Sequence, residues 1–473
     1  MKFSKDNLEF LGHSKNYIFA DFFSKALYFL VLPIITRLLS PSDFGVVSVF
    51  MALIAVFEII FELNFRGTIS RYYFEKNFDF KSFIGTNLIF LTTYGAILLL
   101  ILFSTVNFWT RFLYVEKQVV YAGFIVSYIY IYLNILLSYL RAAQKSKEFA
   151  LVNVLYNTLI LVIAVFLYIY LKEDKYLGRV YSTLLIVSVF SIFAIVKLVK
   201  LSNWNFKPNH IYLAVLFGIP LLPHSLSSFI LAQFDKVIIN QLEGSYDTGL
   251  YSFAYNVAMI MYVFVIGMDK SWSPMFYKKM NSNDKAGINE LAQNYTKYVF
   301  SVALILVLFS REIVIIMADK KYHASLSIIP IIIIGYIFVF LYTLYIKYSL
   351  YYKKTYLVSI CTIIAGIVNV VLNYAFIPKY GYKFAAISTV ISYFLLFIFH
   401  FSNVKYILKE KTMIKLHFML VPFILVVLAV TFTNILFETS LVKDYISIII
   451  RLIFLIAALY ILFRKSINKM IIR

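Results

Sequence analysis

Residues 28–50 read YFLVLPIITRLLSPSDFGVVSVF, and this stretch decides the class of protein. An apolar run that contains Pro33 ends near Arg37, and a Ser-Pro-Ser-Asp-Phe-Gly turn leads directly into a second apolar run. A helix that crosses a bilayer needs roughly 20 mostly apolar residues. The pattern therefore predicts a membrane helix, a tight turn and a second membrane helix.

The rest of the chain has the same character. It contains 473 residues, of which 62% are hydrophobic and only 14% are charged, whereas about a quarter of the residues in an average soluble domain are charged. Apolar runs of spanning length recur from end to end, and they are continuous rather than alternating. Because lipid offers the backbone no hydrogen bonds, such runs must be helical, so the prediction is an all-α polytopic membrane protein.

Fourteen membrane-spanning helices are expected. The first is interpreted as a retained helix rather than a signal peptide, because no small-residue cleavage site follows it. The predicted spans are 17–36, 44–64, 83–105, 119–140, 149–171, 177–199, 211–233, 249–269, 295–317, 325–346, 355–377, 384–404, 416–437 and 445–463.

Basic residues gather on one side of this predicted topology. The loops on the side of the two termini carry roughly twice as many Lys and Arg residues as the other loops, which predicts cytoplasmic termini. Attraction to anionic lipid accounts for the net charge of +21, and without a basic soluble module no nucleic-acid partner is expected. The longest loops, 66–82 and 270–294, leave no room for a catalytic domain.

Parts of the chain repeat with a period near 204 residues. Gly45-x-x-Ser48 opens the second span, and Gly249-x-x-Ser252 opens the eighth, 204 residues later. The copies are six spans apart, so both enter the membrane from the same side, as in a parallel repeat. The predicted organisation is a six-helix lobe at 1–205, a second six-helix lobe at 206–405, and two additional helices with a cytoplasmic tail at 406–473.

Charged residues inside predicted spans of the first lobe are candidates for function, because each costs roughly 2.5–3.5 kcal/mol at the bilayer centre. Asp21 and Lys25 are spaced to pair on one helix face. Glu58 and Glu62 are also four residues apart, so they require a cation, a proton or a basic neighbour such as Lys25. Glu62 has a second interpretation as a solvated residue near the span end.

The second half contributes a further set of polar candidates. His224 lies in the segment GIPLLPHS, whose two prolines interrupt helical hydrogen bonding. Asp235 and Lys236 lie near the outer end of the seventh span, and Asp269 and Lys270 near the inner end of the eighth. Arg451 is expected to extend toward the interface or bind lipid. No metal-binding or nucleophile motif is present, so no metal and no enzymatic activity are expected.

Several segments resemble the bacterial polysaccharide transporters, the O-antigen or lipid-linked repeat-unit flippases of the multidrug/oligosaccharidyl-lipid/polysaccharide exporter superfamily. The resemblance rests on LPIITRLLSPSDFGVVSVF (32–50), RAAQKSKEF (141–149), FDKVIINQLEGSYDTGLYSFAYNVA (234–258), SWSPMFYKKM (271–280) and IPKYGYKFAAISTVISY (377–393). It implies a MATE-like fold of two six-helix lobes, to which two C-terminal helices are added. It also implies transport of undecaprenyl-diphosphate-linked oligosaccharide across the inner membrane.

The family is described with a cationic cavity, and Lys25, Arg37, Lys236 and Lys270 are the positions that match it. The implied partners are the lipid-linked oligosaccharide, membrane lipids and, as a candidate, a polysaccharide polymerase. No cofactor is expected, and coupling to protons or to sodium is left open. Two alternatives remain: a cation-coupled multidrug exporter that uses the acidic residues, and a membrane polymerase or glycosyltransferase.

Overall fold

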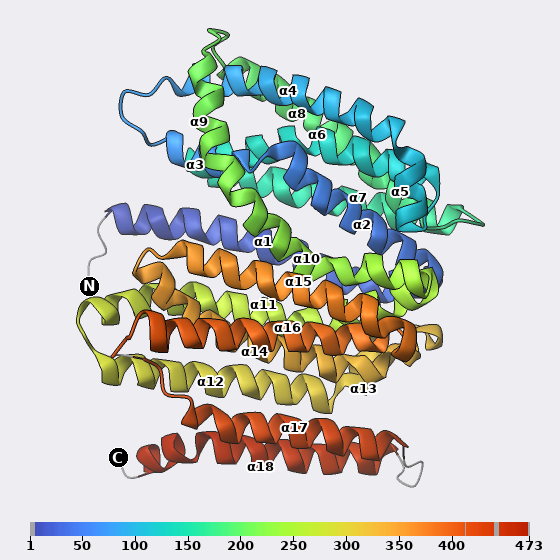
Figure 1. Cartoon of the computed structure of the whole chain (residues 1–473). Helices are drawn as coiled ribbons and strands as arrows, with labels where there is room; N and C mark the ends of the chain where they lie inside the picture. Colours follow the sequence, from blue (N-terminus) through green and yellow to red (C-terminus); the bar gives the residue numbers. More distant parts are fainter. Residues whose placement is uncertain (1–4, 412, 439–443, 472–473) are drawn as a thin grey trace. The chain divides into compact units, whose positions relative to one another are not determined.

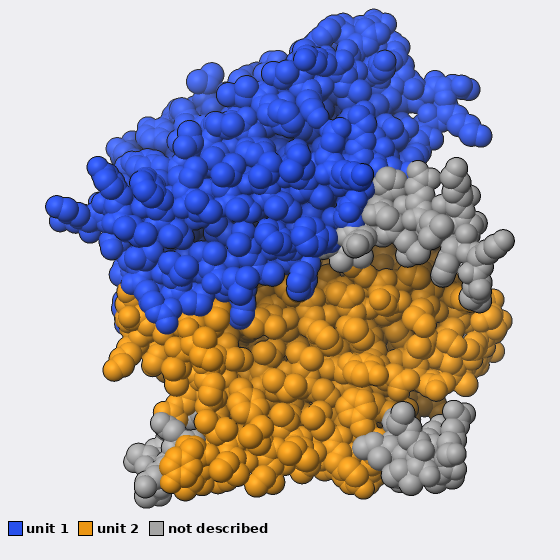
Figure 2. Space-filling view, turned by 180° about the vertical axis from the view of Figure 1, so that it is seen from behind, with its two compact units in different colours: residues 1–249 blue, residues 250–473 orange. Residues whose placement is uncertain are grey.

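The computed structural model describes residues 5–411, 413–438 and 444–471, with side chains described except at 5–15, 18, 21, 436–438, 444 and 465–471. The described chain is helical throughout and forms two compact units, residues 1–249 and 250–473 (Figure 2). The predicted lobes, divided at 205 and 405, remain a prediction, because a unit defined by packing need not coincide with a sequence repeat.

Unit 1 contains the first ten α-helices and the start of the eleventh (Figure 1). They are α1 (Lys5–Leu38), α2 (Pro41–Glu62), α3 (Phe65–Tyr72), α4 (Phe80–Ser104), α5 (Val106–Leu113), α6 (Lys117–Ala142), α7 (Ser146–Tyr170), α8 (Leu177–Leu201), α9 (Pro208–Gly218) and α10 (Leu222–Leu242). A 3₁₀ turn, Ile219–Leu221, separates α9 from α10, as the two prolines of this segment predict.

Unit 2 contains most of α11 and the helices that follow it (Figure 1). They are α11 (Ser245–Asn281), α12 (Lys285–Leu308), α13 (Ser310–Met317), α14 (Ile329–Tyr351), α15 (Thr355–Tyr380), α16 (Lys383–Ser402), α17 (His417–Glu438) and α18 (Asp444–Ile471). A 3₁₀ segment, Lys320–Ile328, precedes α14, and a π-helical turn, Asn403–Ile407, follows α16. The last two helices, α17 and α18, both pack against α12.

Thirteen helical segments among the described residues are long and apolar enough to cross a membrane, and each overlaps one predicted span. The remaining predicted span, 17–36, lies in α1, part of whose side chains fall outside the described residues. The all-α, multi-pass architecture predicted from the sequence is therefore confirmed.

The prediction of two long loops, at 66–82 and 270–294, is wrong, because helices occupy most of both segments. Residues 65–72 form α3, and α11 continues to Asn281, so that only residues 282–284 separate it from α12. In each case an aromatic or aliphatic residue recurs on one helix face and is buried: Phe65, Ile69 and Tyr72 in α3, and Trp272 and Phe276 in α11. This buried stripe stabilises a helix where the charges alone suggest a loop.

The turn in the opening stretch is built as its residues predict. The Ser40 hydroxyl accepts a hydrogen bond from the Asp43 backbone N–H at 3.0 Å, and the Asp43 carboxylate accepts one from the Ser40 backbone N–H at 3.1 Å. This reciprocal capping satisfies two backbone donors at the start of α2, and Pro41 occupies the first helical position, where no donor is needed.

The glycines that open the two copies of the Gly-x-x-Ser motif, Gly45 and Gly249, lie at a close helix contact within unit 1. A Cβ placed on Gly45 would lie 1.9 Å from the Ser245 carbonyl oxygen, and one on Gly249 would lie 1.8 Å from the Pro41 carbonyl oxygen. Each glycine thus faces the backbone four residues before the other glycine. The absence of a side chain at both positions allows the first turns of α2 and α11 to touch.

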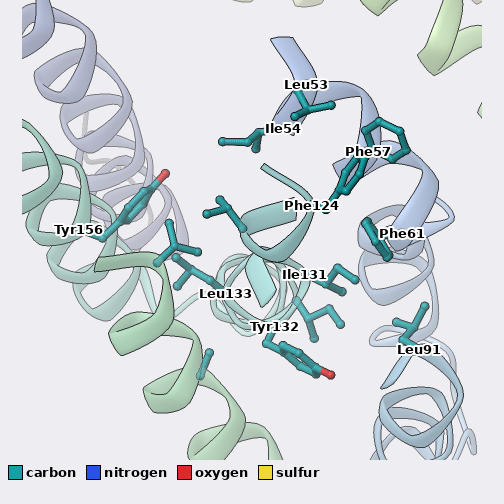
Figure 3. Packing of buried hydrophobic residues seen from close by; sticks show 14 of the residues in the cluster. Leu53, Ile54, Phe57, Phe61, Leu91, Phe124, Ile131, Tyr132, Leu133 and Tyr156 are labelled. Carbon is teal, nitrogen blue, oxygen red and sulfur yellow. The ribbon is translucent and has the colours of Figure 1, made fainter. Parts of the chain in front are cut away.

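The core of unit 1 is built on one face of α2. Leu53, Phe57 and Phe61, spaced four residues apart, are at most 3% exposed and lie toward α6 (Figure 3). The rings of Phe57 and Phe124 meet edge to face with centroids 4.9 Å apart. This packing fixes the orientation of α2, so that Glu58, one residue after Phe57, is directed toward a different group of neighbours.

Candidate functional site

Three charged side chains and one amide of unit 1 form a compact group, here called the acid–arginine cluster: Glu58 and Glu62 of α2, Arg66 of α3 and Asn134 of α6. Arg66 Nε donates to Glu62 Oε1 at 2.8 Å, and an Arg66 Nη2 nitrogen lies 2.9 Å from Glu58 Oε1. Asn134 Nδ2 also donates to Glu58 Oε1, at 2.9 Å. One guanidinium therefore bridges both carboxylates.

A sharp chain reversal brings Arg66 to the glutamates. Leu63 and Asn64 adopt left-handed conformations, with φ of 48° and 59°, between the end of α2 and the start of α3. The Arg66 backbone N–H also donates to Glu62 Oε1, at 2.9 Å. Glu62 consequently anchors the first turn of α3, where a carboxylate is favoured by the exposed N–H groups.

Two interpretations of the glutamates need correction. The basic neighbour of Glu58 and Glu62 is Arg66, which the sequence placed in a loop, and not Lys25. Glu62 is not solvated at the end of its helix, because its side chain is only 1% exposed. Arg66 could have been found from its spacing, four residues after Glu62, if α3 had been recognised as a helix.

Unit 2 contains a second intramembrane ion pair, between Asp269 of α11 and Lys347 of α14. Lys347 Nζ lies 2.7 Å from Asp269 Oδ2, and the two side chains are 11% and 19% exposed. Ser273 Oγ donates a longer hydrogen bond to the same carboxylate oxygen, at 3.4 Å. The partner of Asp269 is thus Lys347, 78 residues away, and not its sequence neighbour Lys270.

Lys270 is exposed on α11 and has no hydrogen-bond or ion-pair partner among the described residues. Adjacent residues on a helix point in different directions, which explains why the Asp269 ion pair leaves Lys270 aside. Lys25 is likewise exposed, on α1. The side chain of Asp21, its predicted partner, lies outside the described residues, so the pair stays a prediction.

The other predicted binding residues are distributed over α1 and α10. Arg37 is exposed and donates from Nη1 to the Pro33 carbonyl at 2.8 Å. Lys236 is 8% exposed and donates to Gln233 Oε1 at 2.6 Å, while Asp235 is 1% exposed. His224 is half-buried.

Arg451, whose side chain is only 1% exposed, forms an ion pair in unit 2 that the sequence did not predict. Its guanidinium makes two parallel bonds of 2.7 and 2.8 Å to the Glu312 carboxylate, and it also donates to the Leu308 carbonyl at 2.7 Å. The expectation that Arg451 reaches the interface or binds lipid is wrong. Its partners are protein groups on α12 and α13.

Comparison of the sequence with known protein families shows which family the chain belongs to. Residues 16–280 match the family described as "Polysaccharide biosynthesis protein", which is more than half of the chain. The chain belongs to this family. Residues 220–375 of the chain also match the MatE family.

Relatives of this family member come from two bacteria. "Lsg locus putative protein 1" of Haemophilus influenzae is 23% identical over 364 residues, which cover 75% of this chain and 88% of the relative. "Capsular polysaccharide biosynthesis protein CapF" of Staphylococcus aureus is 24% identical over 410 residues, covering 82% and 97%.

Solved structures with the same fold include a flippase and a drug transporter. The lipid II flippase MurJ in an inward closed conformation superposes with a TM-score of 0.73 at 15% identity, covering 95% of this chain and 98% of MurJ. An inward-facing multidrug resistance MATE family transporter superposes with a TM-score of 0.67 at 16% identity, covering 82% and 96%. The chain therefore has the fold of these solved structures.

Proposed function

We propose that this protein is a flippase for undecaprenyl-diphosphate-linked oligosaccharide repeat units, acting in the synthesis of O-antigen, capsule or exopolysaccharide. The family match over residues 16–280 carries the proposal. The fold shared with a lipid II flippase supports it, because lipid II flippases also handle a lipid-linked substrate. A capsular polysaccharide biosynthesis protein among the relatives supports the link to surface polysaccharide.

The proposed substrate matches the charges of the membrane helices. A diphosphate is anionic, and charge-assisted hydrogen bonds from Lys or Arg are the strong contacts for it. Lys270 is exposed on α11, a helix long and apolar enough to cross a membrane, and Lys25 is exposed on α1 within the first predicted span. An unused charge in a membrane helix would be costly. We propose that each of these lysines, Lys25 in unit 1 and Lys270 in unit 2, can bind a diphosphate.

The proposed transport cycle is alternating access. The chain resembles a MATE family transporter in the inward-facing form, with a TM-score of 0.67, and in the outward-facing form, with a TM-score of 0.54. In this proposal both termini lie in the cytoplasm, as the bias of Lys and Arg residues favours, and the protein resides in the inner membrane. It acts as a transporter rather than an enzyme, and a proton or sodium gradient drives it.

Replacing Lys25 or Lys270 by alanine is expected to reduce surface polysaccharide about tenfold or more, because each charge-assisted hydrogen bond contributes roughly 1.5–3 kcal/mol. The measurement is quantification of surface polysaccharide and of lipid-linked intermediates in a deletion strain complemented with each variant. Lipid-linked intermediates should accumulate while protein levels stay normal.

Lys278→Ala is a matched control, because Lys278 is exposed on the same helix as Lys270. Normal export by both Lys25→Ala and Lys270→Ala would refute the assignment of the diphosphate to these lysines. If the deletion strain loses resistance to cationic drugs and keeps its polysaccharide, the multidrug-exporter alternative replaces the proposed function.

A further inference from the structure

A small cavity lies beside the acid–arginine cluster inside unit 1. Its walls come from the end of α2, from α3 and from the neighbouring faces of α4 and α9, and its polar lining residues are Glu62 and Asn87. The cavity admits the centre of a water-sized sphere over about 10 Å³. A volume of roughly 10–15 Å³ corresponds to one water molecule, so the site can hold one water molecule, one desolvated ion or one proton with its donor, and no substrate.

Two acceptor oxygens of these lining residues are buried without a hydrogen-bond partner in the part of the chain that the structure describes: Glu62 Oε2 and Asn87 Oδ1. The two side chains are 1% and 0% exposed. A buried acceptor that lacks a donor costs roughly 1–3 kcal/mol, and more for a charged group. Both oxygens are satisfied when one species between them supplies the missing donor or charge: a water molecule, a proton carried by Glu62, or a cation.

The orientation of the Asn87 amide is fixed by its nitrogen. Asn87 Nδ2 donates to the Phe83 carbonyl at 2.9 Å and to the His210 carbonyl at 3.4 Å. Exchanging the amide oxygen and nitrogen would place the oxygen against two carbonyl oxygens, which repel it. The oxygen therefore remains on the other side as an acceptor.

The charges of the acid–arginine cluster favour a proton or a cation in this cavity over a neutral water molecule. Glu58 and Glu62 carry two negative charges when ionised, whereas Arg66 supplies one positive charge. Glu62 Oε1 receives both bonds from Arg66, the backbone N–H and Nε. One negative charge therefore remains uncompensated in an apolar environment, where an unpaired charge is strongly unfavourable.

We propose that Glu62 Oε2 and Asn87 Oδ1 bind one monovalent positive charge, a proton carried by Glu62 or a sodium ion, and that this site couples the gradient to transport. The proposed ion binding is inferred only from the cavity and the buried acceptor oxygens of unit 1. Its role in coupling rests on the proposed flippase function.

In the described part of the chain, few titratable or charged groups lie near Glu62, so few residues can make the stability of this site depend on pH. Arg66 of α3 and Glu58 of α2 are the charged groups that act on it. From α6, Asn134 bonds to Glu58, and α4 contributes the neutral Asn87. From α9, the His210 backbone carbonyl accepts a hydrogen bond from Asn87 Nδ2.

The test measures the melting temperature of the full-length protein in detergent between about pH 5 and pH 9, in sodium chloride and in choline chloride. Binding of a charge to the folded protein alone raises its stability. If a proton binds, the melting temperature of the wild-type protein should fall as pH rises, by about 3 °C or more, with equal values in the two salts. If sodium binds, sodium chloride should raise the melting temperature at high pH and choline chloride should not.

Glu62→Gln is expected to remove either response, because the glutamine amide donates to Asn87 Oδ1 without a charge. Glu148→Gln is the matched control: it removes a carboxylate of unit 1 that pairs with Lys197 at the surface, and it should leave the response intact. If Glu62→Gln cannot be purified, Asn87→Leu, which has a similar volume, should weaken the response.

A wild-type melting temperature that responds neither to pH nor to sodium, as a neutral water in the cavity would give, would overturn the ion site, and so would a response that persists in Glu62→Gln or in Asn87→Leu. Loss of the response in Glu62→Gln with normal polysaccharide export would overturn its role in coupling. Because melting temperatures require no substrate, these outcomes are independent of the test of the flippase function.

Discussion

Replacing Gly249 by alanine is expected to lower the free energy of unfolding by about 2 kcal/mol or more, as overpacking of a tight contact does. The added Cβ would lie 1.8 Å from the Pro41 carbonyl oxygen. A backbone carbonyl cannot rotate away as a flexible side chain can, so the first turns of α2 and α11 must separate. The measurement is the melting temperature of the purified full-length protein, which should fall by about 2 °C or more.

A glycine elsewhere on the same helix provides the control. A Cβ on Gly267 would have no neighbour within 4 Å, so Gly267→Ala should be neutral or stabilise α11 by up to about 1 kcal/mol. Gly45→Ala should behave like Gly249→Ala, and the double variant should lose less than the sum, because one separation of the helices relieves both clashes. A Gly249→Ala protein that melts with the wild type would show that this contact is not tight.

The helices and the internal repeat could both be predicted from the sequence, for different physical reasons. Each apolar run specifies its own membrane helix locally, so the spans could be recognised without knowing their neighbours. The repeat was visible because both copies of Gly-x-x-Ser must allow a close approach. Sequence similarity at a spacing of 204 residues thus reflects one physical contact within unit 1.

The ion-pair partners were not predictable in the same way. Asp269 and Lys270 are adjacent in the sequence, yet the partner of Asp269 comes from α14, 78 residues away. Arg66 was assigned to a loop because the helix that carries it has only 8 residues, too few to give a periodic pattern. The sequence identifies which intramembrane residues are charged, but helix packing decides which charges meet.

The sequence also could not predict which oxygen atoms of Glu62 form hydrogen bonds in the folded protein. Glu62 was recognised as an acid that needs a cation, a proton or a basic neighbour. The fold supplies the basic neighbour through Oε1 and leaves Oε2 without a hydrogen-bond partner among the described residues. Asn87, an ordinary polar residue of an apolar helix, became a candidate only when its amide oxygen was found at the same cavity.

Replacing Arg451 by methionine is expected to destabilise unit 2 by about 3 kcal/mol, since it removes one partner of a buried ion pair. The Arg451 side chain is 1% exposed and that of Glu312 is 28% exposed, so the remaining carboxylate can recover part of its hydration and the loss should lie at the low end of the usual range. The melting temperature of the full-length protein should fall accordingly.

The double variant Arg451→Met/Glu312→Leu separates the effect of the pair from that of packing. Because a hydrophobic pair avoids the desolvation of two charges, the double variant should be more stable than Arg451→Met alone. Arg464→Met, at an exposed position of α18, should change stability little. If Arg451→Met melts like Arg464→Met, the ion pair does not hold α18 against α13, and packing of α17 and α18 on α12 must do so instead.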